Sequence, residues 1–386
     1  MARHTASILI NNYNYGRFLA EAIESALAQT CNETEVIVVD DGSTDDSREV
    51  MSRYAGRIVP VFKGNAGQAS AYNAGFAASR GEVVVLLDAV DILYPTAVER
   101  AVAAFDEPGL VKAQWPLAVT RGDGRPTGKL STVRTPPEGD LRPMVLRDGP
   151  FYDFDLTTGC GYARSFLSKV LPAPEPPYRN GADVYLITLA PVYGLIRNIS
   201  EPQGTYRSHG QNNLRGRTLD ADRVRNYAAR FETNCDVLAE HLTSQGDCAD
   251  TAAWRRNNIN HQWPTRLLRA WSDIENLVPD GGSYVLVDGD ELGACPPVPG
   301  RRAIPFVERN GQYWGPPADD DAAVRELERQ RAAGASHVVF WWTAFWWLEH
   351  YAGMTHWLRS ASRTVIADDH LVAFDLRSSP AQEANA

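Results

Sequence analysis

The stretch from Ala6 to Pro95 decides the fold. It contains three short apolar runs, Ala6-Ser-Ile-Leu-Ile10, Glu35-Val-Ile-Val-Val-Asp40 and Glu82-Val-Val-Val-Leu-Leu-Asp88. Each run has the length and composition of a buried strand, and a segment with helical spacing of apolar residues follows it. Alternating strands and helices predict an α/β domain with a mainly parallel sheet flanked by helices. The carboxyl ends of such strands form one edge, where open α/β sheets bind ligands.

The rest of the sequence predicts a division into four parts. They are a sheet-containing first domain, a helical connector, a smaller C-terminal α/β domain and a disordered tail. These parts cover residues 1–215, 216–280, 281–378 and 379–386. The first contains further strand patterns at 111–119 and 196–206. The connector pattern breaks at 244–250 and at Pro264, and the C-terminal domain ends in a hairpin around Asp368-Asp369-His370.

Composition limits the function. The 386 residues carry a formal net charge of -10, which argues against nucleic-acid binding because such binding rests on clustered positive charge. Five scattered cysteines without a Cys-x-x-Cys pair argue against a zinc site and favour reduced thiols. No signal-peptide pattern is found, and the apolar run 338–348 is too short to span a bilayer. We therefore expect a cytoplasmic protein, either free or peripheral to the inner membrane face.

Acidic residues follow two of the predicted strands. Asp40 and Asp41 could accept hydrogen bonds from a ribose or a base, although a turn with a helix cap also explains the pair. Asp88 and Asp91 end the most apolar strand, where carboxylates are suited to hold Mg²⁺ or Mn²⁺ against a diphosphate. The alternative is that Asp91 caps the next helix and that Asp88 accepts hydrogen bonds from backbone amides.

Two further sets of residues have both a functional and a structural interpretation. Gly64, Gly67, Asn73 and Gly75 lack the Gly-x-Gly-x-x-Gly pattern of dinucleotide binding, and they favour close ligand approach and tight helix packing about equally. The C-terminal tryptophans could stack on sugar rings, but burial is the favoured interpretation. They are Trp341, Trp342, Trp346, Trp347 and Trp357.

Four motifs occur in a fixed order along the first domain. They are Ile10-Asn-Asn-Tyr-Asn14, Val39-Asp-Asp-Gly-Ser-Thr-Asp45, Asn65-Ala-Gly67 with Asn73-Ala-Gly75, and Leu87-Asp-Ala-Val-Asp91. Together they resemble glycosyltransferase family 2, closely over residues 6–105 and more weakly through Gly181-Ala-Asp183 and 206–212. The resemblance implies a GT-A type fold, a nucleotide-diphosphate sugar as donor and inversion of the anomeric centre.

The resemblance also implies roles for individual residues. Asp183 matches the catalytic base, which removes the proton from the acceptor hydroxyl. Asp88 matches the first acid of the family's Asp-x-Asp motif, so that Asp88, Asp91 and His209 would hold Mn²⁺ or Mg²⁺. The residues expected at the nucleotide sugar lie at strand ends or in the loops and helices that follow. They are Asn12, Tyr13, Asp40, Gln68, Asn73, Asp88 and Arg207.

The main departure from the family pattern is Val90, which stands at the second acid of the metal motif. Three interpretations follow. Asp88, Asp91 and His209 could hold a metal more weakly, Arg207 and His209 could offset the diphosphate charge without metal, or the site could bind a donor with little or no transfer. The first is favoured, because phosphate oxygens and water can complete the coordination.

We therefore predict an inverting glycosyltransferase, with a glycan, a lipid-linked sugar or a natural product as acceptor. The C-terminal domain would shape the acceptor site or mediate self-association into a homo-oligomer. A nucleotide-sugar sensor is the non-enzymatic alternative, which Val90 and Ala182 favour. A sugar-1-phosphate nucleotidyltransferase is less favoured, because Ile10-Asn-Asn-Tyr-Asn14 is not the glycine-rich basic loop that such an enzyme needs.

Overall fold

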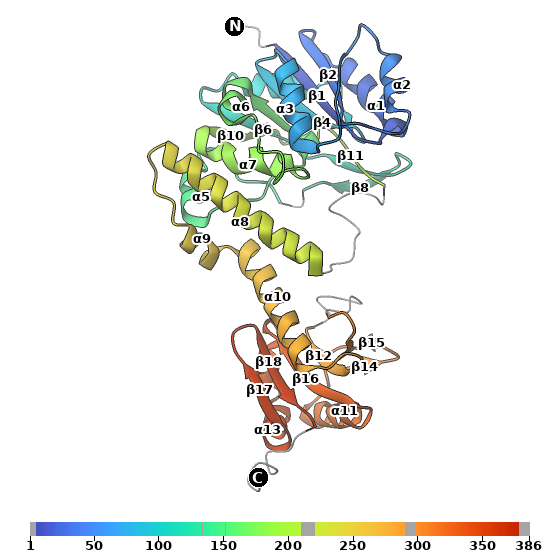
Figure 1. Ribbon diagram of the computed structural model, residues 1–386, viewed down its shortest axis with the longest axis vertical. Helices are drawn as coiled ribbons and strands as arrows, with labels where there is room; N and C mark the ends of the chain where they lie inside the picture. The colour runs from blue at the N-terminus through green and yellow to red at the C-terminus, as the bar shows by residue number, and fades with distance from the viewer. Residues whose placement is uncertain (1–4, 133, 151, 210–220, 290–297, 378–386) are drawn as a thin grey trace. The chain divides into compact units, whose positions relative to one another are not determined.

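The computed structural model describes residues 5–132, 134–150, 152–209, 221–289 and 298–377. The chain forms two compact units (Figure 1). The first unit comprises residues 1–216 and 230–258, and the second comprises residues 217–229 and 259–386. The segment interpreted as a connector is thus divided between them, and the expected tail lies outside the described residues.

The first unit is built on a seven-stranded sheet with the order β10-β6-β9-β4-β1-β2-β3. The run β4-β1-β2-β3 is parallel, β9 is antiparallel to both of its neighbours, and β10 is parallel to β6. The strands are β1 (Ala6–Asn12), β2 (Thr34–Asp40), β3 (Val59–Phe62), β4 (Val83–Asp88), β6 (Leu110–Gln114), β9 (Cys160–Ala163) and β10 (Leu195–Asn198). The register pairs Asn12 with Asp40 and Asn11 with Asp88. The predicted, mainly parallel sheet is confirmed, and its polar strand ends lie side by side.

Helices cover both faces of this sheet (Figure 1). Because side chains alternate along a strand, β1 places Ile8 and Ile10 in one core and Leu9 in the other. The core around Ile8 is closed by α1 (Gly16–Leu27), α2 (Ser47–Ser52) and α4 (Ala97–Ala104). The core around Leu9 is closed by α3 (Gln68–Ala78), α6 (Arg164–Val170) and α7 (Ala182–Tyr193).

A second, four-stranded sheet of the first unit has the order β5-β11-β7-β8. Its strands are β5 (Ile92–Leu93), β7 (Ala118–Arg121), β8 (Pro126–Leu130) and β11 (Gly204–Ser208). The expectation of one strand over 196–206 was wrong, because the segment supplies β10 to the first sheet and β11 to the second. Pro202 lies between the two strands, and a proline cannot donate to a strand ladder.

The remaining helices of the first unit pack around a small apolar cluster that also includes Val192 of α7. They are α5 (Arg142–Asp148), α9 (Thr251–Asn257) and α8 (Ala221–Ser244), which begins in the second unit. Phe231, Cys235 and Leu238 of α8 contact Val145 of α5 and Trp254 of α9 in this cluster. The predicted break at 244–250 is confirmed, since it separates α8 from α9.

The second unit contains a five-stranded sheet with the order β13-β12-β16-β18-β17. Its strands are β12 (Ser283–Val287), β13 (Arg302–Pro305), β16 (Ala335–Trp341), β17 (Arg363–Ala367) and β18 (Leu371–Asp375), and β14 (Glu308–Arg309) pairs separately with β15 (Gln312–Tyr313). Its helices are α10 (Ile259–Leu277), α11 (Asp320–Ala332), α12 (Trp346–His350) and α13 (Ala352–Ala361), with a 3-10 turn η2 (Trp342–Ala344). The predicted hairpin around Asp368-Asp369-His370 is confirmed.

Two sequence expectations fail in the second unit. Pro264 does not break the helical pattern but lies buried inside α10, on the apolar side that carries Leu267 and Trp271. Burial of the tryptophans is confirmed for Trp341 and Trp347, whereas Trp346 is 52% exposed. No helix of the described ranges is both long enough and apolar enough to cross a membrane.

Candidate active site

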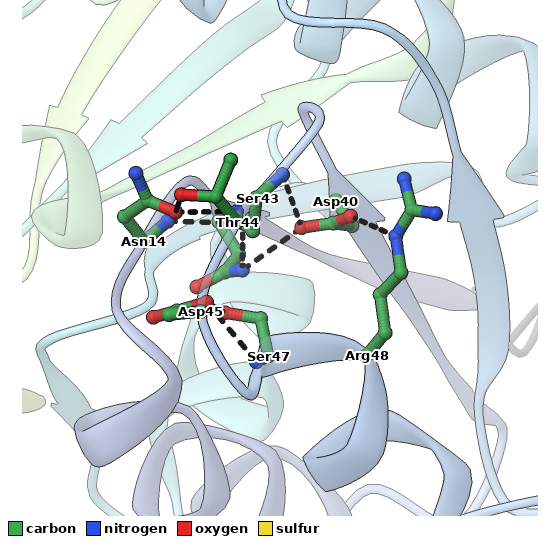
Figure 2. Close-up of polar contacts among 8 residues, drawn as sticks. Asn14, Asp40, Ser43, Thr44, Asp45, Ser47 and Arg48 are labelled. Atoms are coloured by element: carbon green, nitrogen blue, oxygen red, sulfur yellow. Dashed lines mark hydrogen bonds and ion pairs between the residues drawn. The ribbon is translucent and has the colours of Figure 1, made fainter.

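The ends of β1 and β2 are tied together by side chains (Figure 2). The Asn12 amide donates to Asp40 at 3.3 Å and to the Ser43 hydroxyl at 3.2 Å. Asp40 is fully buried and also accepts a hydrogen bond from the Ser43 amide and, at 2.9 Å, from Arg48 Nε. These three hydrogen bonds hold the Asp40 carboxylate in place at the end of β2.

The loops after the two strands are locked to each other as well. Asn14 has a positive φ of 58°, which asparagine tolerates better than most residues. The Asn14 side-chain oxygen accepts a hydrogen bond from the Thr44 backbone amide at 2.8 Å, and the Asn14 backbone amide donates to Ser43 Oγ (Figure 2). Asp45 accepts from the Gly16 amide at the start of α1. It also accepts from Ser47 at the start of α2 (Figure 2). The Asn-Tyr-Asn and Asp-Gly-Ser-Thr-Asp motifs therefore form one rigid rim.

Asp41 has a different environment from Asp40, although the two are adjacent. It is 2% exposed and forms an ion pair with Lys63. It also accepts hydrogen bonds from the backbone amides of Ala66 and Gly67, at 3.1 and 2.7 Å. Asp41 therefore holds the glycine-containing loop that directly precedes α3.

Asp88 and Asp91 lie at the end of β4 and in the turn that follows. The Asp91 carboxylate accepts from the Arg207 amide at 2.9 Å and from the Thr158 hydroxyl at 2.7 Å. Burial raises the pKa of Asp91 to about 7, although these hydrogen bonds act in the opposite direction. Burial, and then the charges of Asp91 and Asp183, raise the pKa of Asp88 well above its usual range.

Asp183 belongs to the first turn of α7, which Gln68 caps. The Gln68 side-chain oxygen accepts from the amides of Gly181 and Ala182 at 2.7 and 2.9 Å. One Asp183 oxygen accepts from the Thr157 hydroxyl at 2.8 Å, and the other accepts from the Val184 amide. The structure thus brings Asp183 close enough to Asp88 for their charges to interact.

Arg207 of β11 contacts the Asp88–Asp91 turn. Its side chain is nearly buried, donates to the Val90 carbonyl at 3.0 Å and pairs with Glu21 at 2.5 Å. Its guanidinium also lies 4.8 Å from the centre of the Phe18 ring. Arg207 therefore fixes the backbone of the turn, and its charge is balanced by Glu21.

The other residues expected at the site, Tyr13, Asn73 and His209, have separate surroundings and make none of the contacts described above for the acids. Tyr13 is 44% exposed at the end of β1. Asn73 donates to the Ala173 carbonyl and accepts from the Ala173 amide, so it ties α3 to the segment after α6. The His209 ring packs against the rings of Tyr15 and Phe18, at 5.5 and 5.6 Å between centres.

Some residues near these acids were missed by the sequence reasoning. Thr157 and Thr158 contact Asp183 and Asp91, but no periodicity or motif marked them. Lys112 is fully buried in β6, where it donates to Gln114, and burial lowers its pKa. A lysine in a strand pattern suggests an exposed face, so the sequence held no signal for its burial.

Asp88 is the side chain that fits a divalent cation best. Within the described ranges its carboxylate forms no hydrogen bond or ion pair, and it faces the charges of two other acids. Oxygen donors of this kind suit Mg²⁺ and Mn²⁺. A cation would also stabilise the ionised form of Asp88, which burial disfavours.

A second group of possible ligands lies in the other unit. Asp273, Asp368 and His370 offer ligand atoms within 4.8 Å of one another. However, His370 Nε2 lies 2.7 Å from Asp273 and Nδ1 lies 2.8 Å from Asp368. Both ring nitrogens of His370 therefore already have acidic partners, and these contacts join the β17–β18 hairpin to α10.

Comparisons with known proteins agree with the motifs. A family model described as Glycosyl transferase family 2 matches residues 7–171. An uncharacterized glycosyltransferase of Nostoc sp. is 39% identical over 211 residues, 54% of this chain and 66% of that protein. The glycosyltransferase GlyG of Streptococcus pneumoniae is 35% identical over 97 residues, 24% of this chain and 32% of that protein.

Among solved structures, S. aureus TarS 1-349 in complex with UDP-GlcNAc aligns with a TM-score of 0.46 and 18% identity, over 69% of this chain and 80% of that chain. This chain spans less than two thirds of the length of the Nostoc and Streptococcus relatives. The family match covers β1 to α6, including the rim and the Asp88–Asp91 turn. Residues 7–171 of this chain are therefore a glycosyltransferase family 2 domain.

Proposed function

We propose that this chain transfers a sugar from a nucleotide-diphosphate donor to an acceptor hydroxyl with inversion, and that Asp183 is the general base. One observation carries the proposal, namely that Asp88, Asp91 and Asp183 lie close enough to interact, on the sheet edge where β1 separates Asp88 from Asp40. The Nostoc and Streptococcus relatives are named as glycosyltransferases, which supports the same class of reaction.

The rim at β1 and β2 is the proposed position of the nucleoside. Asp40 is fixed by Asn12, Ser43 and Arg48, so its carboxylate is held in place before a ligand arrives. A preorganised acceptor loses little freedom when it binds a base or ribose donor. Tyr13 is exposed at the same strand end and offers a ring for stacking.

Asp183 has the features that a base for a hydroxyl requires. Each of its oxygens accepts one hydrogen bond, so each retains a lone pair that can take the acceptor proton. Proton removal by a positioned carboxylate accelerates such a step by about 10²- to 10⁴-fold. The bond forms at the anomeric carbon while the bond to the diphosphate breaks on the opposite face.

The leaving diphosphate carries growing negative charge, which Mn²⁺ or Mg²⁺ would offset when bound. Asp88 is the proposed protein ligand, because its carboxylate faces the other acids with no partner in the described ranges. Asp91 is only 1% exposed, whereas Asp88 is not fully buried, and Arg207 is paired with Glu21. We therefore favour weak metal binding through Asp88 over a metal-free site that relies on Arg207.

The test compares Asp183→Asn with the wild type in two assays. Calorimetry with UDP, TDP and GDP in the presence and absence of Mn²⁺ measures nucleotide binding. Release of nucleoside diphosphate from the corresponding nucleotide sugars measures turnover. We expect turnover to fall at least about 100-fold while nucleotide affinity changes little, because asparagine keeps the shape but is not a base.

Asp123→Asn is the matched control, since Asp123 is an exposed acid of the same unit, and it should behave as wild type. Turnover retained in Asp183→Asn would remove Asp183 from the role of base. Tight nucleotide binding by a wild type that releases no diphosphate from any sugar would support a nucleotide-sugar sensor instead. Val90 is the observation that favours that second function, because it provides no carboxylate.

A further inference from the structure

Two neighbouring hydroxyl groups connect acids that belong to different elements. Thr157 and Thr158 form the 3-10 turn η1 (Thr157–Gly159), which leads into β9. Thr157 donates to Asp183 at the start of α7, and Thr158 donates to Asp91 after β4. A single dipeptide thus contacts the proposed base and the acidic turn.

The Thr158 hydroxyl is fixed from both sides. Its side chain is fully buried, and its oxygen accepts a hydrogen bond from the Asp88 amide at 3.1 Å. Because the oxygen accepts from Asp88 and its proton is donated to Asp91, the hydroxyl joins the two ends of the turn. Rotation about its Cα–Cβ bond would break both hydrogen bonds.

The turn itself is held close to the end of β6. The Trp115 amide donates to the Gly159 carbonyl at 2.9 Å, and the Gly159 amide donates to the Leu156 carbonyl at 2.8 Å. A Cβ atom at Gly159 would lie 2.4 Å from the Trp115 carbonyl oxygen, so a larger residue would push the turn away. The backbone that carries the two hydroxyls is therefore anchored independently of the acids.

We propose that Thr157 and Thr158 are positioning residues that set the separation between the acceptor-side base, Asp183, and the donor-side acids, Asp88 and Asp91. The inference rests on the function proposed above. The Cα atoms of adjacent residues are about 3.8 Å apart, and hydrogen bonds hold the Thr157 and Thr158 hydroxyls in direction, so the two hydroxyls keep a nearly constant spacing. In-line transfer needs the hydroxyl and the diphosphate held on opposite faces of one carbon, and misplacement by about 1 Å can cost a large part of the rate.

The two hydroxyls should have separable effects. Thr157→Val removes the hydrogen bond to Asp183 and keeps the shape of the side chain. We expect kcat for diphosphate release to fall about tenfold or more, with donor KM and nucleotide affinity within about twofold of wild type. Thr158→Val removes the bond to Asp91 and should instead weaken UDP, TDP or GDP binding in Mn²⁺ by about tenfold.

The serine variants and one control make the test specific. Thr157→Ser and Thr158→Ser keep the hydroxyls and should recover most of the lost kcat and affinity respectively. Thr34→Val is the control, because it removes a comparable hydroxyl, bonded to the Cys31 carbonyl at 2.8 Å, at the opposite end of β2. It should lower the melting temperature slightly and leave both kcat and nucleotide affinity unchanged.

The possible outcomes separate this inference from the proposed function. If the wild type releases no diphosphate from UDP-, TDP- or GDP-sugars, the proposed function fails and the inference falls with it. If the wild type is active and Thr157→Val matches it in kcat, only the inference is overturned. The inference is also overturned if both valine variants lose kcat and affinity together, or if serine does not restore them.

Discussion

Asp41 offers a sharp test of how the rim is held together. The Asp41→Ala substitution removes a buried carboxylate that pairs with Lys63 and accepts from the amides of Ala66 and Gly67. Breaking a buried ion pair from one side costs about 3–5 kcal/mol. The Lys63 side chain is 18% exposed and also donates to the Gly64 carbonyl, so water and this carbonyl can stabilise its charge. We therefore expect the lower part of that range, about 3–4 kcal/mol.

Asp41→Asn should cost less, about 1–2 kcal/mol, because the amide oxygen can still accept from one of the two backbone amides. Glu49→Ala is the matched control, since Glu49 and Arg53 form an ion pair in which both side chains are largely exposed. That loss should be about 0.5 kcal/mol. Urea denaturation followed by circular dichroism, with the slope of the transition compared between variants, measures all three.

A loss below about 1 kcal/mol for Asp41→Ala, or one equal to that of Glu49→Ala, would refute the reasoning. It would mean that the loop between Gly64 and Gly67 does not depend on Asp41. The adjacent Asp40 provides the functional contrast. Asp40→Asn should weaken nucleotide binding in calorimetry, because Asp40 is the acid proposed to face the nucleoside.

Three further predictions concern metal binding, thiol reactivity and pH. Val90→Asp should lower the melting temperature in EDTA, because it adds a charge at a site only 7% exposed. The same variant should raise turnover in Mn²⁺, whereas the uncharged Val90→Asn should not gain turnover. Unchanged turnover and metal affinity in Val90→Asp would contradict this account. Burial raises the pKa of the Cys160 thiol to about 11, so only about one molecule in a thousand is thiolate at pH 8. Mass spectrometry after brief alkylation should find exposed Cys248 modified well before Cys160. The reverse order would contradict the burial of Cys160. Burial lowers the pKa of His241, so the unfolded state binds the proton more readily than the folded state. The free energy of unfolding should therefore fall as the pH drops through about 6.5. This fall should be shallower in His241→Gln, and a pH profile identical to that of the wild type would argue against the contribution of His241.

The sheet could be predicted because its signals are local. The strands β1, β2 and β4 are continuous apolar runs, and each polar strand end follows directly in the sequence. Alternation of strand and helix then requires those ends to share one edge. The splitting of 196–206 into two strands could not be predicted in the same way, because it depends on which neighbours are available to each half.

The roles of Gln68 and Asn73 depended on contacts far along the chain. Asn73 belongs to the motif Asn65-Ala-Gly67 with Asn73-Ala-Gly75 and Gln68 directly follows Gly67, and both were expected at the nucleotide sugar. Asn73 bonds to Ala173, 100 residues away, and Gln68 caps a helix whose first residues are more than 110 residues away. No local pattern records such partners, so whether either side chain also contacts the donor stays a prediction.

The pair Asp40 and Asp41 shows most clearly where local reasoning stops. Both are acids at one strand end, and the sequence alone treats them alike. Because successive side chains point to opposite sides of a strand, they meet different surroundings, with Arg48 of α2 beside Asp40 and Lys63 with the loop amides beside Asp41. Each carboxylate accepts three hydrogen bonds, Asp41 from Lys63 and the two loop amides, and Asp40 from Asn12, Ser43 and Arg48. A motif of two acids therefore divides into one that holds the loop before α3 and one that ties the end of β2 to β1 and α2, and the direction of each side chain decides which is which.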